Sequence, residues 1–217
     1  MPTRLRRTEM VERNREAVLA AARRVFIDKG YAGATLEAIA EGAGFSKGVM
    51  YSQFESKADL FMTLLERRIE RRAEQDERIA TEHGGAAGFR RMFEAFAEDA
   101  VTEVAWARAL VEFRALASRD PRLNGRYAAA HAGTVQRLAS ALERLCATAE
   151  LEPRSPPRVM AEFILAVASG ATLESAVNPA ALPFEVLSQM LARALGFTDP
   201  EGSFIFAADP RGPVSAE

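Results

Sequence analysis

The 217-residue sequence has little of what metalloenzymes and secreted domains depend on. It contains one cysteine, Cys146, so no internal disulfide can form. The two histidines, His83 and His131, do not stand at the spacing of metal ligands. No G-x-S-x-G motif or glycine-rich phosphate loop is present. We therefore expect no metal, no cofactor and no catalysis, and a lone cysteine fits the reducing cytoplasm.

Long apolar runs are also missing. The most apolar stretch, residues 163–173, is bounded by Glu162 and Glu174 and is too short to span a bilayer. The basic first ten residues lead into a charged segment, which is not the pattern of a secretory signal. Hydrophobic residues make up 48% of the chain and charged residues 27%, the balance of an ordinary globular protein. The expectation is a soluble cytoplasmic protein without a membrane partner.

Charge is distributed unevenly along the chain. The formal net charge is −2, yet residues 1–72 hold 14 Lys and Arg against 10 Asp and Glu. The remaining residues hold 14 against 20. A basic end on an acidic body suits a protein that meets phosphate at one end. Two differently solvated surfaces would give the same asymmetry, so the charge pattern alone leaves both interpretations open.

Apolar residues recur at helical spacing almost throughout, and no segment keeps the two-residue alternation of a strand. Ser, Thr and Asp residues before these segments are predicted N-caps, and glycines after them are predicted stops. The predicted fold class is all-α, with about nine helices. They cover approximately residues 18–29, 35–42, 46–51, 56–83, 87–99, 104–117, 121–147, 156–178 and 183–195.

Residues 35–57 predict two short helices that meet across a glycine-containing turn, followed by the start of a long helix. A helix as short as 46–51 is marginal by itself, so tertiary packing must hold it. The face that it leaves exposed is small, polar and basic, as in a recognition helix that enters the major groove of DNA. The apolar positions expected to hold the unit together are Leu36, Ile39, Ala40, Ala43, Val49, Met50 and Phe54.

The exposed positions suggest individual roles. Lys47 can reach a phosphate or the acceptor edge of guanine, and Gly48 allows the backbone to approach DNA closely. Tyr51 can donate its hydroxyl to a phosphate while its ring packs inward. The heads of the second and fourth helices are predicted phosphate sites. Their residues are Thr35, Ser56 and Lys57, and those left to read bases are Lys47, Val49, Ser52 and Gln53.

Each of these residues also has a plainer interpretation. Thr35, Ser46 and Ser56 would serve as helix caps in any helical protein. Lysines at 47 and 57 could be solvated surface, and the aromatic rings at 51 and 54 could be core. The joint spacing is what favours a DNA-binding helix-turn-helix.

The stretch A-T-L-E-A-I-A-E-G-A-G-F-S-K-G-V-M-Y-S-Q-F-E-S-K-A-D-L-F, with V-L-A-A-A-R-R-V-F-I-D-K-G-Y before it, resembles the TetR family of bacterial transcriptional regulators. The resemblance is close over residues 11–65. One departure is the pair Ser52-Gln53, where the family often has an aromatic or histidine pair, so no operator sequence is carried over. Family DNA contacts would fall on Thr35, Ser46, Lys47, Gly48, Tyr51, Ser52 and Lys57.

The same resemblance implies a domain organisation. Residues 1–57 would form the DNA-binding domain and residues 58–197 a helical domain for ligand binding and dimerisation. A partly disordered tail would follow at 198–217. Arg4, Arg6 and Arg7 precede the first helix, and we hypothesise an arm that lies along DNA; a solubilising tail is the alternative.

For the body, the resemblance implies a small-molecule inducer and a homodimer. The helices at about 157–177 and 183–195 are the predicted dimer interface, because they carry small and apolar residues that permit close approach. A symmetric dimer would read a near-palindromic site in double-stranded DNA. Candidate ligand contacts, which could equally be ordinary core, are Phe93, Phe96, Trp106, Phe113, His131 and Phe163.

The predicted function is a repressor that a small molecule releases from its operator. A helical interaction module without DNA binding is the main alternative, and an enzyme is a weaker one. DNA binding that falls log-linearly with salt would separate them.

Overall fold

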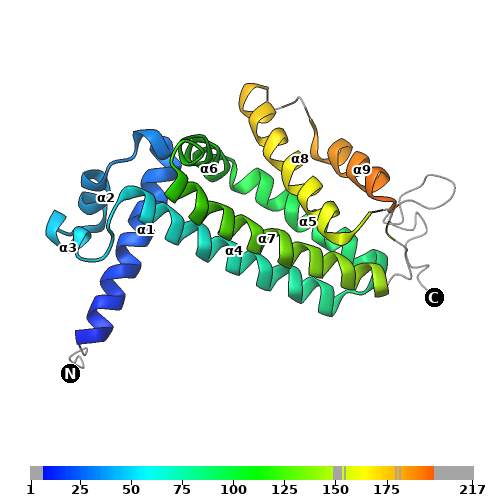
Figure 1. Cartoon of the computed structure of the whole chain (residues 1–217), viewed down its shortest axis with the longest axis horizontal. Coiled ribbons are helices and arrows are strands. Elements are labelled where there is room, and N and C mark those ends of the chain that lie inside the picture. Colours follow the sequence, from blue (N-terminus) through cyan, green and yellow to red (C-terminus); the bar gives the residue numbers. More distant parts are fainter. Residues whose placement is uncertain (1–6, 149–152, 154, 179, 181, 198–217) are drawn as a thin grey trace, which may run out of the picture. The chain divides into compact units, whose positions relative to one another are not determined.

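The computed structural model describes residues 7–148, 153, 155–178, 180 and 182–197. Every regular element in these ranges is a helix, which confirms the all-α prediction (Figure 1). In chain order the helices are α1 (Arg7–Gly33), α2 (Leu36–Ala43), α3 (Lys47–Tyr51), α4 (Lys57–Glu82), α5 (Gly85–Thr102), α6 (Val104–Ala117), α7 (Pro121–Thr148), α8 (Pro157–Val177) and α9 (Phe184–Leu195).

The helix ends follow local signals in the sequence. Asp120 caps α7, since its Oδ1 accepts hydrogen bonds from the backbone N–H groups of Arg122 and Leu123 at 2.9 and 3.1 Å. Gly196 closes α9 with φ 83°, the left-handed region that glycine enters at little cost. The first helix departs from its predicted end at residue 29. It breaks at Gly30, where φ is 69°, and a further turn carries it to Gly33.

Two compact units make up the chain. The first comprises residues 1–71 and 103–131, and the second comprises residues 72–102 and 132–217. The long helices α4 and α7 each contribute to both units. These units describe packing alone, so the functional division expected after residue 57 stays a prediction.

Aromatic side chains form the centre of the first unit. The Phe61 ring of α4 stacks on Trp106 and Phe113 of α6, with ring centroids 4.9 and 4.6 Å apart. It also meets Phe26 and Tyr31 of α1 edge to face, at 5.0 and 5.1 Å. All five side chains are buried. Such pairs contribute roughly 0.5–1.5 kcal/mol each beyond their buried area, so this cluster joins α1, α4 and α6.

The second unit has its own core. It is built from the later turns of α4 and α7 together with α5, α8 and α9. Phe89 of α5 lies against Phe197, which directly follows α9, with ring centroids 4.2 Å apart. Among the described residues, no helix combines the length and the apolar character that crossing a membrane requires.

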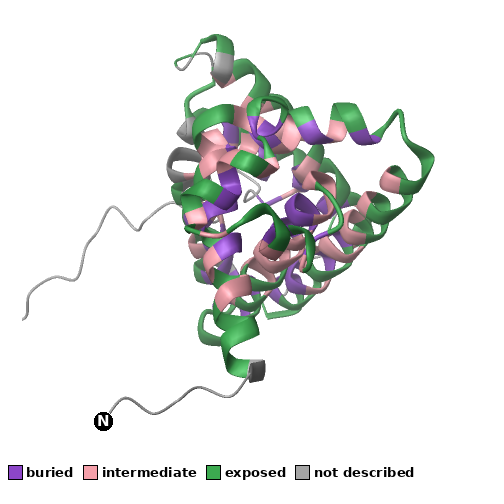
Figure 2. Ribbon diagram, turned by 90° about the vertical axis from the view of Figure 1, so that its left-hand side faces the viewer, coloured by how far each residue is buried: buried purple, intermediate pink, exposed green. Residues whose placement is uncertain are grey.

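The first turns of α1 extend beyond the core of the first unit. Residues 9–13 are all exposed, and Val18 is the first residue of the helix to be buried (Figure 2). Arg7 begins α1, whereas Arg4 and Arg6 of the hypothesised arm lie outside the described residues, as does the whole predicted tail, residues 198–217. The arm therefore stays a hypothesis.

Gly88 of α5 leads to a prediction about stability. A Cβ atom at this position would lie 2.2 Å from the carbonyl oxygen of His83 and 2.4 Å from a methyl carbon of Leu145. Because backbone cannot yield cheaply, we expect Gly88→Ala to lower the free energy of unfolding by about 1–3 kcal/mol. Thermal unfolding at a fixed protein concentration measures the effect.

The matched control is Gly125→Ala in α7, where an added Cβ meets nothing within 4 Å. This change should raise stability, by up to about 1 kcal/mol, since alanine favours a helix over glycine. Equal effects of the two substitutions would show that the close packing at Gly88 does not constrain the fold.

Candidate nucleic-acid interface

Side-chain caps and a glycine turn build the α2–α3 unit. Thr35 Oγ1 accepts a hydrogen bond from Ala38 N at 3.1 Å and starts α2. Gly44, with φ 72°, ends it and donates its N–H to the carbonyls of Ala40 and Glu41. Ser46 Oγ then accepts from Val49 N at 3.4 Å and starts α3. The predicted caps at 35 and 46 are therefore confirmed, and they account for two helices too short to persist alone.

The inward side of the unit matches the predicted apolar set. Ile39, Ala40, Met50 and Phe54 are buried, while the other predicted positions, Leu36, Ala43 and Val49, are half-buried. The outward side is equally well defined. Its exposed residues are Ser46, Lys47, Gly48, Tyr51 and Ser52.

Tyr51 differs from its expected packing. The prediction that its ring packs inward is wrong, because the residue is 54% exposed. Met50 and Phe54 take the inward positions on either side of it, and both are almost fully buried. More than half of the residue's surface is therefore exposed on the outward side, where its hydroxyl can donate or accept.

Lys47 forms an ion pair across the turn. Its Nζ lies 2.9 Å from Glu37 Oε1 of α2, and both side chains are more than half exposed. The hydrogen bond with Lys47 lowers the pKa of the Glu37 carboxyl, and the same bond raises the pKa of the Lys47 ammonium. Glu37 is absent from the predicted site, because its pairing with Lys47 depends on how α2 and α3 meet. A ligand that takes Lys47 must replace this carboxylate.

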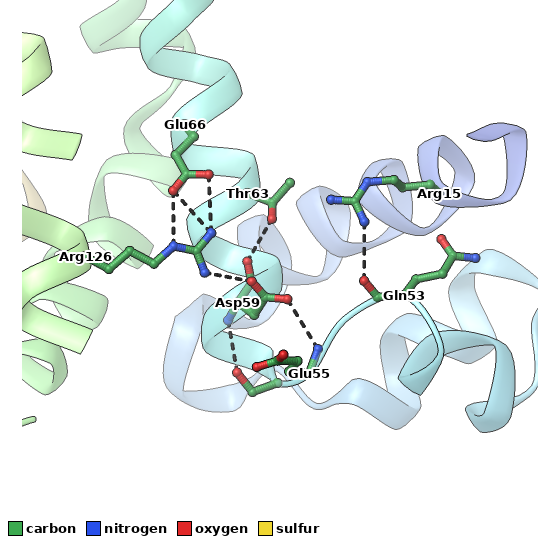
Figure 3. Close-up of polar contacts among 8 residues, drawn as sticks. Arg15, Gln53, Glu55, Asp59, Thr63, Glu66 and Arg126 are labelled. Carbon is green, nitrogen blue, oxygen red and sulfur yellow. Dashed lines mark hydrogen bonds and ion pairs between the residues drawn. The ribbon is translucent and has the colours of Figure 1, made fainter. Parts of the chain in front are cut away.

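Gln53 and Arg15 lie together where α3 leads into α4 (Figure 3). Arg15 Nη1 donates to the Gln53 carbonyl oxygen at 3.3 Å, and its guanidinium carbon lies 4.5 Å from the centre of the Phe54 ring. Within the described part of the chain, the side-chain oxygen of Gln53 is buried without a hydrogen-bond partner. Reading a base through that oxygen would require the side chain to turn outward.

The head of α4 is fixed by a reciprocal cap and by α7. Ser56 Oγ accepts from Asp59 N at 3.1 Å, and Asp59 Oδ2 accepts from Glu55 N at 3.3 Å. Arg126 of α7 reaches the other Asp59 oxygen at 2.7 Å and also contacts Glu66 (Figure 3). Ser56 thus caps α4 as predicted, and with Asp59 it forms a capping box whose second bond is made one residue earlier than usual.

Lys57 is engaged with backbone. Its Nζ donates to the carbonyl oxygens of Tyr31, Ala32 and Ala34. Burial lowers the pKa of this ammonium, and the nearby Glu112 carboxylate acts in the opposite direction. The sequence predicts that Lys57 contacts a phosphate. In the structure its ammonium group is bound to carbonyl oxygens at the end of α1 and in the segment that follows.

The candidate ligand contacts fall in different units. Trp106 and Phe113 belong to the aromatic core of the first unit, and His131 there stacks on Tyr127 with centroids 5.9 Å apart. The indole nitrogen of Trp106 is buried without a hydrogen-bond partner among the described residues. The candidates in the second unit are Phe93, Phe96 and Phe163, the last of which is 42% exposed. As a single ligand set, these six residues stay a prediction.

The paired short helices, the exposed small and basic face of α3 and the helical body together define a helix-turn-helix DNA-binding protein. Residues 18–64 match the family model for bacterial regulatory proteins of the tetR family. Residues 85–197 match that for the C-terminal domain of BetI-type transcriptional repressors. The chain belongs to the TetR family of transcriptional regulators.

Curated relatives align with short parts of the chain. It is 41% identical over 59 residues to the transcriptional activator FasR of Mycolicibacterium smegmatis, covering 27% of each protein. It is also 41% identical over 64 residues to the repressor BepR of Brucella suis, covering 29% of this chain and 31% of BepR. The repressor AcnR of Corynebacterium glutamicum is 35% identical over 81 residues, which cover 37% and 41%. The chain thus matches less than half the length of each relative.

Solved structures share the fold over most of the chain. A TetR transcription regulator from Haloarcula marismortui superposes with a TM-score of 0.71 at 17% identity, covering 85% of this chain and 97% of that one. The regulator FadR from Bacillus subtilis, in complex with stearoyl-CoA, gives 0.61 at 18% identity, covering 82% and 95%. At these identities the likeness concerns the fold alone.

Ser46 gives a prediction that separates capping from surface chemistry. Because α3 has only five residues, we expect Ser46→Ala to lower the free energy of unfolding by about 1 kcal/mol. Ser46→Asp supplies an equivalent cap oxygen and should keep the wild-type melting temperature. If both variants unfold like the wild type in thermal denaturation, the cap does not stabilise α3.

Proposed function

We propose that this chain is a ligand-responsive DNA-binding repressor, which acts in the cytoplasm and leaves its operator when a small molecule binds. The observation that carries the proposal is the outward face of α3, with its small, polar and basic residues all exposed. Met50 and Phe54 are buried on the inward side of α3. This packing stabilises a helix that is too short to form by itself. Membership of the TetR family supports the same role.

The contacts are divided by chemistry. Tyr51 can donate its hydroxyl to a phosphate, and Thr35 stands at the head of α2, where the dipole favours an anion. Lys47 can exchange Glu37 for the acceptor edge of guanine. Gly48 lets the backbone approach. The proposed DNA contacts are Thr35, Ser46, Lys47, Gly48, Tyr51, Ser52 and Gln53.

The proposed repression and ligand control are supported by similarity to known regulators. The C-terminal half matches BetI-type repressors, and BepR and AcnR are repressors, although FasR is an activator. FadR, which shares the fold, was solved with stearoyl-CoA. These similarities favour a repressor with a small-molecule ligand in the helical body, of a chemistry that the sequence does not specify.

A homodimer is proposed through α8 and α9. Both helices leave large apolar residues exposed, and exposed apolar surface of this kind favours association. Phe163 and Leu173 of α8 are 42% and 50% exposed, and Val186 and Met190 of α9 are 46% and 60% exposed. A two-fold dimer would bring the two recognition helices to successive major grooves, about 34–36 Å apart.

DNA binding is tested with duplexes enriched from a random-sequence pool. The affinity of the wild-type chain should fall log-linearly with salt. Lys47→Ala should enrich a different sequence, because a bidentate contact to guanine carries roughly 1–3 kcal/mol of discrimination.

The matched control is Arg137→Ala, which removes the same charge from an exposed site on α7 in the second unit. It should enrich the wild-type sequence. A complete lack of DNA binding at low salt would instead favour a helical interaction module. If the wild type and both variants enrich the same sequence, Lys47 does not contribute to base recognition.

The dimer is tested by Met190→Glu, since a charge buried without a partner opposes association strongly. Analytical ultracentrifugation should show a shift from dimer to monomer. Leu116→Glu is the control, because Leu116 is 52% exposed on α6, outside the proposed interface. If Leu116→Glu dissociates the dimer and Met190→Glu does not, the interface is elsewhere.

A further inference from the structure

The backbone of residues 30–34, from the break in α1 to the residue before the cap of α2, is held by two oppositely charged side chains from other helices. We call these residues the α1–α2 linker. It begins at the break in α1 and ends one residue before Thr35, the cap of α2. Its geometry therefore sets how the α2–α3 unit leaves α1.

Lys57 of α4 holds the acceptors of the linker. Its Nζ donates to the carbonyl oxygens of Tyr31 at 2.8 Å, Ala32 at 3.3 Å and Ala34 at 2.9 Å. The same nitrogen lies 4.6 Å from the centre of the Tyr31 ring. An ammonium group has three N–H donors, and these three carbonyls use all of them.

Glu112 of α6 holds the donor side. Its Oε2 accepts from Ala32 N at 2.9 Å, so Ala32 is bound by the carboxylate through its N–H and by the ammonium through its C=O. The carboxylate also lies against Gly30, where a Cβ atom would be 2.7 and 2.8 Å from its two oxygens. The positive φ at Gly30 favours glycine, and a Cβ atom there would also require the Glu112 carboxylate to shift.

Tyr31, the one large side chain of the linker, lies in the core. Tyr31 is 4% exposed and contacts Phe26, Phe61 and Phe113, with ring centroids 5.8, 5.1 and 5.1 Å apart. The backbone clamp and the aromatic core therefore attach the linker to the same two helices, α4 and α6.

We propose that Lys57 and Glu112 are positioning residues that fix the helix-turn-helix on α4 and α6, and that Lys57 makes no phosphate contact. This inference rests on the proposed DNA-binding function. To contact a phosphate, Lys57 would have to give up its charge-assisted hydrogen bonds to the carbonyl oxygens of Tyr31, Ala32 and Ala34.

The salt dependence of DNA affinity separates the two roles of Lys57. With the duplex enriched by the wild-type chain as probe, each lost phosphate contact lowers the slope of log affinity against log salt by about 0.9. We expect Lys57→Met to bind about tenfold or more weakly at every salt concentration, with the wild-type slope. Because the proposed homodimer carries Lys57 twice, a slope reduced by about 0.9 to 1.8 would overturn the inference.

Lys57→Arg provides an independent test, which also decides between the two roles if Lys57→Met folds poorly. Arginine keeps the charge and binds phosphate well, but its planar fork cannot direct three donors as a compact ammonium does. A phosphate contact predicts full affinity for this variant, and the positioning role predicts a loss close to that of Lys57→Met. Full affinity would contradict the proposal.

For Glu112, the two roles predict opposite changes in DNA affinity. Removing a carboxylate should strengthen DNA binding if only charge matters, whereas Glu112→Ala should weaken it if the residue positions the linker. Glu112→Gln keeps an acceptor for Ala32 N–H and should restore most of the affinity. Stronger binding by Glu112→Ala would overturn the inference.

The double variant Lys57→Met with Glu112→Ala should bind within about a factor of two of the weaker single variant, because both act through one segment. Fully additive losses would contradict a shared clamp. Failure of the wild-type chain to bind any duplex would overturn the proposed function and the inference together. A changed salt slope in Lys57→Met would overturn the inference alone.

Discussion

The packing of Tyr31 against Phe61 is the contact on which the DNA-binding end depends. Phe61 stacks on Trp106 and Phe113, and Tyr31 carries the linker between α1 and α2. The five-residue α3 cannot persist by itself, so its orientation is inherited from this core through α2. The exposed residues Lys47, Gly48 and Tyr51 are not part of the buried core that holds α3, whereas Ser46 caps the helix.

The sequence predicts well whatever is decided locally. Helix ends at Asp120 and Gly196, and the caps Thr35 and Ser46, follow from hydrogen bonds made within a few residues, so their signals are visible in the order of amino acids. The apolar face of the helix-turn-helix follows from periodicity for the same reason. The TetR family is likewise recognisable from that segment.

The sequence predicts poorly where a partner is distant. The exposed ring of Tyr51 depends on neighbours filling the inward positions, and the approach of Arg15 to Phe54 joins residues 39 positions apart in the chain. Lys57 shows the limit most clearly. A lysine beside a serine cap looks like a phosphate site, yet its acceptors are carbonyls more than 20 residues earlier. No local pattern reveals that the ammonium is already occupied.

The basic character of the DNA-binding end must accordingly be judged from contacts rather than from counts. Residues 1–72 carry an excess of four positive charges, but Lys47 is paired with Glu37, Arg67 with Glu16, and Arg23 and Arg68 with Glu103. The last three pairs join α1 and α4 to each other or to Glu103, the residue before α6. The Lys47–Glu37 pair differs, because both partners are exposed on the outward face and joined across the turn that a groove would meet. In the proposed complex, Lys47 would exchange that carboxylate for DNA, so the same contact would contribute to both affinity and sequence preference.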